Sequence, residues 1–400
     1  MTARAKPSPD ILIAGAGIAG LAAAIALART GRTVTLLEKR AASSEEGAGI
    51  QIGPNGSRIL QSLGVAPNLA GKVAHPQSIR VMDGLTGRPL TQFPLGPDIA
   101  ARHGAPYWSL HRADLHDALR TTAQSIPAIT LRHAAELTGA TQSGDTVTVH
   151  LADGETLNGP LVIGADGLWS TLRTHVLHSP SLTFTGKCAL RTVLTATDVP
   201  PGISLTDTTI WLRPKAHVVH YPVRGGAELA LVAIFDDADI GESWAHDADP
   251  ASIATRAQAF PTALRDLLLT PTHWRQWSLY QPSGPITWMQ NRIALIGDAA
   301  HPPLPFLAQG GVMALEDATV LASLLHGVPD SSIPACLAEF ERLRRPRTTR
   351  VMEASARNGR AYHLDGLMRR ARNAVLASTP PHLFMRQYDW LYGWRYEENT

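Results

Sequence analysis

The feature that most constrains this fold is a glycine-rich turn between two short apolar segments near the start of the sequence. Residues 11–14 predict a buried parallel strand, an Ala- and Leu-rich helix runs to about Arg29, and residues 34–37 predict a second strand leading into Glu38. Three glycines separate the first strand from the helix at the spacing G-x-G-x-x-G: Gly15, Gly17 and Gly20. This order is typical of the βαβ unit of a dinucleotide-binding α/β domain.

The residues of this turn have distinct physical roles in such a unit. Gly15 permits the tight turn, Gly17 lets backbone N–H groups approach a pyrophosphate, and Gly20 lets the helix pack closely on the strand. The pyrophosphate would lie at the positive end of the helix, and Glu38 would accept hydrogen bonds from a ribose diol. A glycine-rich turn without a ligand would not explain the second strand and its acid.

A second glycine-rich segment follows, from Lys39 to a helix predicted at residues 55–64. Its glycines are Gly47, Gly49 and Gly53. The stretch around Gln51 is more apolar than a mobile surface loop would be, so we expect this segment to pass close to a flat or bulky ligand. Lys39 and Gln51 are therefore candidate cofactor-binding residues.

Two further strands end in an acid. Residues 161–164 are followed by Asp166, and residues 293–296 are followed by Asp298. An acid just past the carboxyl end of a parallel strand lies where doubly wound sheets bind their ligands. Arg112, in the first turn of a predicted helix, either pairs with a phosphate or is solvated at the surface.

The long interval between these two strands, residues 180–285, predicts a mostly antiparallel sheet that covers the ligand, because it is rich in β-branched residues and interrupted by Pro and Gly. In its strand at residues 216–223, alternation places His217 and Tyr221 on one face and His220 on the other. His217 and Tyr221 are either an acid–base pair or two partly buried residues that pack through their rings.

The C-terminal part predicts helices. A stiff proline-rich loop at residues 301–311 leads into a helix at about 311–325, whose free N–H groups offer another anion site. Residues 334–357 and 361–377 predict two more helices, and the basic run at 341–350 indicates a solvated face rather than a nucleic-acid patch. We expect the aromatic tail that follows to dock on the rest of the protein.

Composition excludes several classes of function. The chain is 44% hydrophobic and 18% charged with a net charge of +2, so it is an ordinary globular protein without an electrostatic case for binding nucleic acid. Cys188 and Cys336 match no metal or redox spacing, which suits a reducing compartment. Residues 1–9 lack the apolar core of a signal peptide, and the apolar run at 21–28 is too short to span a bilayer. We therefore expect a cytoplasmic protein with no membrane partner.

Three motifs in this order resemble the single-component FAD-dependent aromatic hydroxylases, also called class A flavoprotein monooxygenases. They are GAGIAG with Glu38, GADGLWSTLR at 164–173 and GDAAHP at 297–302. Three more segments are similar to the branch of salicylate hydroxylase, 3-hydroxybenzoate 6-hydroxylase and 6-hydroxynicotinate 3-monooxygenase: HVVHYPVRGG at 217–226, HPPLPFLAQGG at 301–311 and WLYGW at 390–394. The resemblance covers nearly the whole chain.

This resemblance implies an α/β fold with a Rossmann-like FAD-binding domain, an inserted and mostly antiparallel β-sheet substrate domain, and C-terminal helices. The expected divisions are 10–179 and 286–330 for the FAD-binding domain, 180–285 for the substrate domain, and 331–400 for the C-terminal helices and tail. The glycine turn and Glu38 would hold the ADP half of FAD, and Arg112 would reach its phosphate or ribityl side.

The same resemblance assigns the remaining site residues. Asp298 would bond the ribityl chain, and the backbone at Gly310 and Gly311 would stabilise negative charge at flavin N1–C2=O. Asp166 would serve both FAD and the nicotinamide cofactor, in keeping with the lack of a second fingerprint. His217 and Tyr221 match the His-x-x-x-Tyr substrate pair of the branch.

The implied activity is hydroxylation of a small phenolic or hydroxy-heteroaromatic acid by NADH or NADPH and O₂, through a flavin C4a-hydroperoxide, in a monomer or homodimer. A phenol with a pKa of ~10 costs roughly 4 kcal/mol to ionise at pH 7. A neutral His217 is suited to accept that proton, and Tyr221 to bond the phenolate or the carboxylate. Pro305 stands where the 3-hydroxybenzoate enzymes carry Gln, which disfavours that substrate because Pro cannot donate a hydrogen bond.

Other functions stay open from the sequence. A plain NAD-dependent dehydrogenase would explain Glu38 but not the motifs of Asp166 and Asp298. A flavin-dependent halogenase would need a Trp-x-Trp-x-Ile-Pro segment, and Trp274 and Trp277 have the wrong spacing. Two alternatives keep the flavin: an oxidoreductase of the same fold acting on a non-phenolic substrate, and a non-catalytic flavin-binding protein.

Overall fold

The glycine-rich unit forms the middle of a six-stranded sheet in the computed structural model, which describes residues 11–42, 49–242 and 246–396. β1 (Ile11–Ala14) pairs in parallel with β2 (Val34–Leu37) on one side and with β11 (Leu161–Gly164) on the other. The sheet has the order β18-β19-β11-β1-β2-β7. Its remaining strands are β7 (Ile129–Arg132), β18 (Met289–Gln290) and β19 (Ile293–Leu295). Both predicted strand-then-acid units therefore lie beside the glycine turn.

Three helices pack together against this sheet. Most residues of α1 (Ile18–Arg29) are buried, and many of them are Ala or Leu. The helix contacts α4 (Arg112–Gln124) and α7 (Gly310–Leu324). Ala and Leu have high helix propensity, and the small Ala side chains let neighbouring helices approach closely. As a result, the N-termini of α1 and α7 are held near the carboxyl ends of the parallel strands.

The second large layer is an eight-stranded sheet with the order β16-β17-β12-β15-β14-β13-β4-β5. Its strands are β4 (Ser78–Asp83), β5 (Pro89–Pro94), β12 (Leu182–Thr195), β13 (Thr208–Arg213), β14 (Ala216–Val223), β15 (Glu228–Asp236), β16 (His246–Asp247) and β17 (Arg275–Pro282). All neighbouring pairs are antiparallel except β13 and β4. Because β4 and β5 precede residue 180, the interval 180–285 holds most of this sheet and not all of it.

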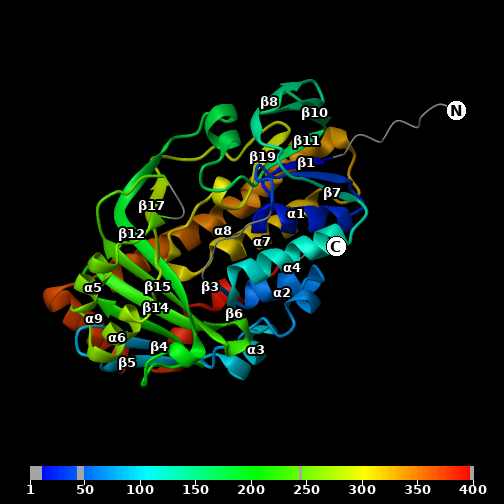
Figure 1. Cartoon of the computed structure of the whole chain (residues 1–400). Helices are drawn as coiled ribbons and strands as arrows, with labels where there is room; N and C mark the ends of the chain where they lie inside the picture. Colours follow the sequence, from blue (N-terminus) through cyan, green and yellow to red (C-terminus); the bar gives the residue numbers. More distant parts are fainter. Residues whose placement is uncertain (1–10, 43–48, 243–245, 397–400) are drawn as a thin grey trace.

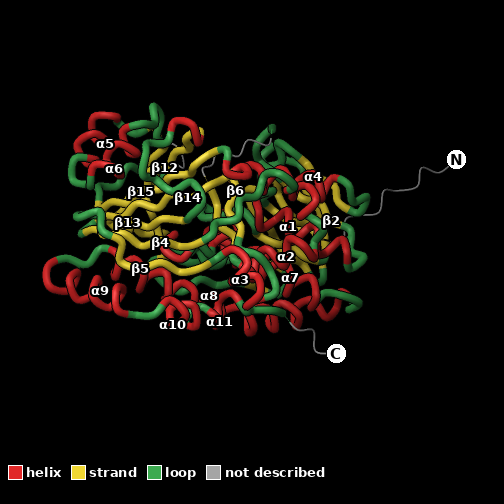
Figure 2. Tube along the Cα trace, turned by 90° about the horizontal axis from the view of Figure 1, so that it is seen from below, coloured by secondary structure: helices red, strands yellow, loops and turns green. Residues whose placement is uncertain are grey.

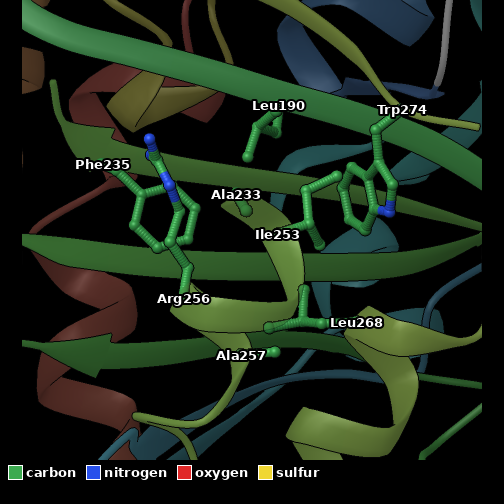
Figure 3. A pocket seen from close by; sticks show the side chains of 8 residues that line it. All are labelled: Leu190, Ala233, Phe235, Ile253, Arg256, Ala257, Leu268 and Trp274. Carbon is green, nitrogen blue, oxygen red and sulfur yellow. The ribbon is translucent and has the colours of Figure 1, made fainter. Parts of the chain in front are cut away.

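One face of this sheet is covered by two short helices (Figures 1 and 2). α5 (Pro250–Ala257) and α6 (Thr262–Leu269) cover one face through an apolar cluster that includes Val218 and Leu231. A pocket of about 10 Å³ lies within this cluster, lined by residues such as Leu190, Phe235 and Trp274 (Figure 3). That volume holds about one water molecule, so this pocket is a packing gap and not a substrate site.

Smaller elements complete the chain. They are β3 (Gly49–Ile52), α2 (Pro54–Ser62), α3 (Gly96–His103), β6 (Trp108–His111), β8 (Leu137–Ser143), β9 (Thr146–Leu151), β10 (Thr156–Gly159), α8 (Ile333–Tyr362), α9 (Gly366–Ser378), α10 (Pro381–Arg386) and α11 (Asp389–Tyr392). β3 pairs with β6, and β8, β9 and β10 form a third sheet. The aromatic tail docks as predicted, since Tyr392 is buried and Trp394 packs against Arg344.

Candidate active site

The glycine turn between β1 and α1 is shaped by close backbone contacts. Gly15 has a φ of +98°, and a Cβ there would lie 2.5 Å from the carbonyl oxygen of Ala165. A Cβ on Gly20 would lie 1.9 Å from the carbonyl oxygen of Gly15, so both positions require glycine. Gly17 is the N-cap of α1, and nothing lies within 4 Å of a Cβ built on it. Open space therefore faces the positive end of α1, where a pyrophosphate would bind.

Glu38 lies at the end of β2 beside this turn. Its Oε2 accepts a hydrogen bond from the backbone N–H of Ala16 at 3.0 Å, and its Oε1 accepts one from Arg40 at 3.0 Å. Lys39, the next candidate, is exposed. His116 was not predicted from the sequence, yet its buried Nε2 lies 2.8 Å from the carbonyl oxygen of Ala16 and fixes the same turn from α4.

Asp166 follows β11 and has an unmet hydrogen-bonding capacity. Its Oδ2 accepts the N–H of Leu172 at 3.2 Å, whereas its Oδ1 is buried without a partner among the described residues. Burial raises the pKa of this carboxyl group, and bonds from Ser170 and Leu172 oppose the shift. A buried acceptor without a donor is costly, so this position suits a ligand that brings a hydroxyl or amide donor.

Asp298 lies just past β19, at the N-terminus of α7. A Cβ on Gly310, the first residue of α7, would lie 3.8 Å from its Oδ1. Burial raises the pKa of the Asp298 carboxyl group, and the charge of Arg112 is the largest influence that lowers it. Asp298 therefore lies beside the N-terminus of α7 and within the electrostatic influence of Arg112, although these residues come from three separate segments.

Arg173 joins the loops of the two acids. Its side chain is 1% exposed, and its guanidinium donates to the carbonyl oxygens of Ala299 at 3.3 Å and of Leu168. These bonds tie the loop after β11 to the loop after β19. The residue lies inside the GADGLWSTLR motif, but nothing in the spacing alone indicated this role.

A buried ionic network supports α7 from behind. Glu316 and Asp317 are fully buried and pair with Arg344, and Arg347 also bonds Glu316. Asp317 also accepts hydrogen bonds from the backbone N–H of Gly297 and from the ring of His301, which holds the Asp298 loop in place. The basic run at 341–350 was expected to be solvated. That prediction was wrong for Arg344, which is 1% exposed.

His217 and Tyr221 lie on the same face of β14, opposite Ile234 and Ala230 of β15. Both are buried, and their face is the one turned away from α5 and α6, where Val218 packs. A Cβ on Gly49 would lie 2.3 Å from the Tyr221 ring, so the flat neighbour predicted for this segment includes a side chain of the protein itself. Gly47 lies outside the described residues.

The surroundings of His217 are mainly aromatic. Its ring centroid lies 5.5 Å from that of Phe306, which belongs to the proline-rich loop before α7, and 5.2 Å from that of Tyr362. Its Nδ1 lies 2.8 Å from Nε2 of His363. Burial lowers the pKa of His217 well below its usual value, so the imidazole is neutral at pH 7. His363, beyond the end of α8, was not predicted.

Gln51 joins the small β3–β6 sheet to the eight-stranded sheet. It lies on β3, and its Oε1 accepts hydrogen bonds from the hydroxyl of Tyr107 at 2.9 Å and from that of Thr208 at 3.4 Å. Its carbonyl oxygen is therefore occupied by protein donors, which leaves the amide N–H groups to face a ligand.

These features together define a class of protein. A parallel sheet with an open glycine turn, an unpaired buried acid after a second strand and an acid at a helix N-terminus fit FAD, which carries a pyrophosphate, sugar hydroxyls and a polar ring edge. The antiparallel sheet brings a His and a Tyr to the same region. This is the arrangement of a flavin-dependent oxidoreductase.

Comparison with known proteins identifies the family. The FAD binding domain family matches residues 8–355, and this chain belongs to it. It is 35% identical to a 3-hydroxybenzoate 6-hydroxylase of Klebsiella oxytoca over 97% of both chains. It is 34% identical to a 6-hydroxynicotinate 3-monooxygenase of Bordetella bronchiseptica over 88% of this chain and 91% of that protein. A salicylate hydroxylase substrate complex has a TM-score of 0.82 at 25% identity, over 97% of this chain and 96% of that one.

The protein is an FAD-dependent monooxygenase, and the predicted fold and cofactor are confirmed. The two alternatives that kept the flavin without aromatic hydroxylation are not favoured by these relatives. Among the helices of the described ranges, none is both long and apolar enough to cross a membrane.

Proposed function

We propose that this protein hydroxylates a small hydroxyaromatic acid, using FAD, a nicotinamide cofactor and O₂, and that His217 receives the proton of the ring hydroxyl. The observation that supports this most directly is the pair of buried side chains on β14: a neutral His217 and Tyr221 on the face next to the loop before α7. A relative acting on 3-hydroxybenzoate and one acting on 6-hydroxynicotinate support the substrate class.

In this proposal the cofactor is held by residues from several segments that lie far apart in the sequence. The turn of Gly15, Gly17 and Gly20, with Glu38, Lys39, Gln51, Arg112, Asp166, Asp298, Gly310 and Gly311, would contact FAD. FAD, once bound and reduced, supplies the redox and oxygen chemistry. The protein positions the ring of the substrate, removes its proton and excludes water.

Removal of the proton is the step in which His217 would act. A phenol of pKa ~10 is ionised at pH 7 at a cost of roughly 4 kcal/mol, and an ionised ring hydroxyl makes the ring a better nucleophile. His217 can accept this proton because burial keeps it neutral. Burial also raises the pKa of Tyr221, so its hydroxyl stays protonated and can donate a hydrogen bond to the phenolate or the carboxylate.

The proposal is made for a class of substrate. The two relatives compared above act on rings that share a hydroxyl and a carboxylate. Pro305 begins a short 3₁₀ turn, Pro305–Leu307, in the loop that also carries Phe306, and it has no N–H to donate. Pro305 therefore argues against 3-hydroxybenzoate, while the identity to its hydroxylase argues for it.

Three further parts of the proposal concern the nicotinamide cofactor, the cellular compartment and the oligomeric state. The lack of a second nucleotide fingerprint suggests weak binding of the nicotinamide, with NADH preferred. Cys188 and Cys336 are both free thiols, which suits the cytoplasm. We expect a monomer or a homodimer.

A substrate screen tests the function. The purified holoenzyme would be mixed with NADH and, separately, with salicylate, 6-hydroxynicotinate and 3-hydroxybenzoate. We expect one acid to accelerate NADH oxidation and to gain a hydroxyl group, detected by the mass of the product; for salicylate, hydroxylation at the carboxyl-bearing carbon would also release CO₂. Unaccelerated oxidation with all of these and related hydroxyaromatic acids, or acceleration that yields only H₂O₂, would count against it.

A further inference from the structure

His217 has a polar neighbour in addition to the aromatic rings around it. Its Nδ1 lies 2.8 Å from Nε2 of His363, and the two ring centroids are 5.1 Å apart. The side chain of His363 is 8% exposed, and that of His217 is buried among aromatic rings. Each ring has one nitrogen facing the other ring and one nitrogen facing away from it.

The far nitrogen of His363 meets an ion pair at the edge of the buried region. Its Nδ1 lies 3.2 Å from Nζ of Lys187 and 3.6 Å from Oδ1 of Asp236. Lys187 and Asp236 are directly opposite each other on β12 and β15 and form a salt bridge. Their side chains are 23% and 40% exposed, so this pair reaches solvent.

We propose that His363, Lys187 and Asp236 form a proton relay that carries the proton accepted by His217 from the substrate to the surface. The proposal rests on the function proposed above, because it assigns a route to the proton that His217 removes. His363 is a relay residue and does not touch the substrate.

The transfer conserves protons at each step. Before transfer, Nδ1–H of His217 would donate to Nε2 of His363, and Nδ1–H of His363 would face the carboxylate of Asp236. When Nε2 of His217 takes the phenolic proton, its Nδ1–H bond breaks and that proton moves to Nε2 of His363. The Nδ1–H proton of His363 then leaves through the carboxylate of Asp236 to water. Both imidazoles end neutral but in the other tautomer, and one proton has reached solvent. Uptake of a proton along the same path, when the ring oxygen of the product is protonated, restores the first tautomer.

The ion pair explains how both tautomers can be stable. The 3.2 Å contact with Lys187 corresponds to the state after transfer, in which Nδ1 of His363 has a lone pair and the ammonium donates to it. Before transfer, Nδ1–H of His363 would donate to the carboxylate of Asp236, which lies 3.6 Å away. Because Lys187 can donate to Nδ1 of His363 and Asp236 can accept from it, the two imidazoles can change tautomer without leaving a buried polar atom unpaired.

Charge and burial keep the proton from resting on either ring. Burial, and then the charge of Lys187, lower the pKa of His363 to about 4, while Asp236 opposes the shift. Arg372, whose guanidinium donates to the carbonyl oxygens of Ala361 and Tyr362, lowers it further. Phe306 and Tyr362 are the other rings against His217 and carry no charge at pH 7. An imidazolium is thus transient here, which a relay requires.

The first experiment measures proton release. Holoenzyme would be mixed with the most effective acid of the screen in weakly buffered phenol red. We expect His363→Gln to bind the acid and to be reduced by NADH, but to release the proton at least about tenfold more slowly and to form more H₂O₂. Added imidazole should restore part of the rate, which a purely structural defect would not permit. His220→Leu, on the same strand and the opposite face, is the control and should behave as the unmodified enzyme.

Unchanged proton release and coupling in His363→Gln, with an enzyme that makes product, would overturn the relay and leave the proposed function intact. If no acid yields product, the proposed function fails, and a second experiment still decides the relay. In ¹⁵N-histidine NMR of the holoenzyme, Lys187→Met should shift the pair toward the tautomer with the proton on Nδ1 of His217. Asp236→Asn should shift it toward Nε2. Tautomer populations that are the same in Lys187→Met, Asp236→Asn and the unmodified protein would overturn the relay.

Discussion

Gly49 packs against the ring of Tyr221 so closely that a Cβ on Gly49 would lie 2.3 Å from Cε2 of that ring. The same Cβ would lie 2.7 Å from Cβ of Ala230, the residue opposite Tyr221 on β15. β3 and β14 therefore fit together only because residue 49 lacks a side chain. This contact links the cofactor-side segment around Gln51 to the proposed substrate face.

Gly49→Ala should displace the Tyr221 ring. Because overpacking a buried contact costs about 1–3 kcal/mol, we expect a loss of stability of that size and weaker binding of the aromatic acid. Urea unfolding and substrate titration measure the two effects. In a Tyr221→Ala background the clash with the ring is absent and only the contact with Cβ of Ala230 remains, so Gly49→Ala should then cost less stability. Equal costs in both backgrounds would show that the ring is not what residue 49 touches.

Asp298→Ala should weaken the retention of FAD. A carboxylate facing the hydroxyls of the cofactor makes charge-assisted hydrogen bonds of roughly 1.5–3 kcal/mol, which corresponds to a loss of affinity of about 10- to 150-fold. Fluorescence of released flavin on dilution measures this. Glu38→Gln, which keeps the size of the side chain at the other end of the site, gives a matched comparison. Unchanged affinity in Asp298→Ala would remove this residue from the cofactor site.

His217→Ala should separate reduction from hydroxylation. We expect the variant to retain FAD and to be reduced by NADH, because those steps do not need a base at the substrate ring. The ring would stay largely protonated, so NADH would be consumed with H₂O₂ formed and little product, a loss of coupling within the 10²–10⁴-fold range of general base catalysis. Tyr221→Phe should mainly weaken binding. If the opposite face of β14 met the substrate, the results would be exchanged: His220→Ala would be uncoupled, and His217→Ala would behave as the unmodified enzyme.

The spacing of residues along single strands and turns was sufficient to predict one part of the site. The glycine turn, the strands that end before Asp166 and Asp298, and the shared face of His217 and Tyr221 follow from spacing along single elements. His363 lies 146 residues from its partner His217. It reaches that partner because the 30-residue helix α8, which contacts β18 of the six-stranded sheet, ends at Tyr362 beside His217, and no periodicity encodes this.

Other features were missed for the same reason. The burial of Arg344 depends on Glu316 and Asp317 of α7, so a basic run on a helix could not be distinguished from a solvated face. β4 joins the eight-stranded sheet through a parallel pairing with β13, far along the chain. Contacts between distant segments decide both features, and each was visible only in the folded structure.

His220 allows a prediction about acid stability. It is fully buried with neither ring nitrogen bonded among the described residues, and burial lowers its pKa to about 3. Its pKa in the unfolded chain is ~6.5. Between these values the unfolded state binds one more proton than the folded state, so stability is present above pH ~6.5 and falls as the pH decreases toward 3. The loss is about 1.4 kcal/mol per pH unit once the pH is well below 6.5.

His220→Leu should remove that proton and with it part of the acid sensitivity. At pH 7 the variant should be at least as stable as the unmodified protein, because a buried polar ring without partners is replaced by an apolar side chain. Between pH 7 and pH 5 the unmodified protein should lose about 2 kcal/mol more than the variant. Urea unfolding at the two pH values measures this difference. Buried His217 and His363 also have lowered pKa values and titrate in both proteins, so their contribution cancels. An equal loss in both proteins would mean that His220 has a hydrogen-bond partner in solution, such as a buried water shared with Thr209 on the neighbouring strand.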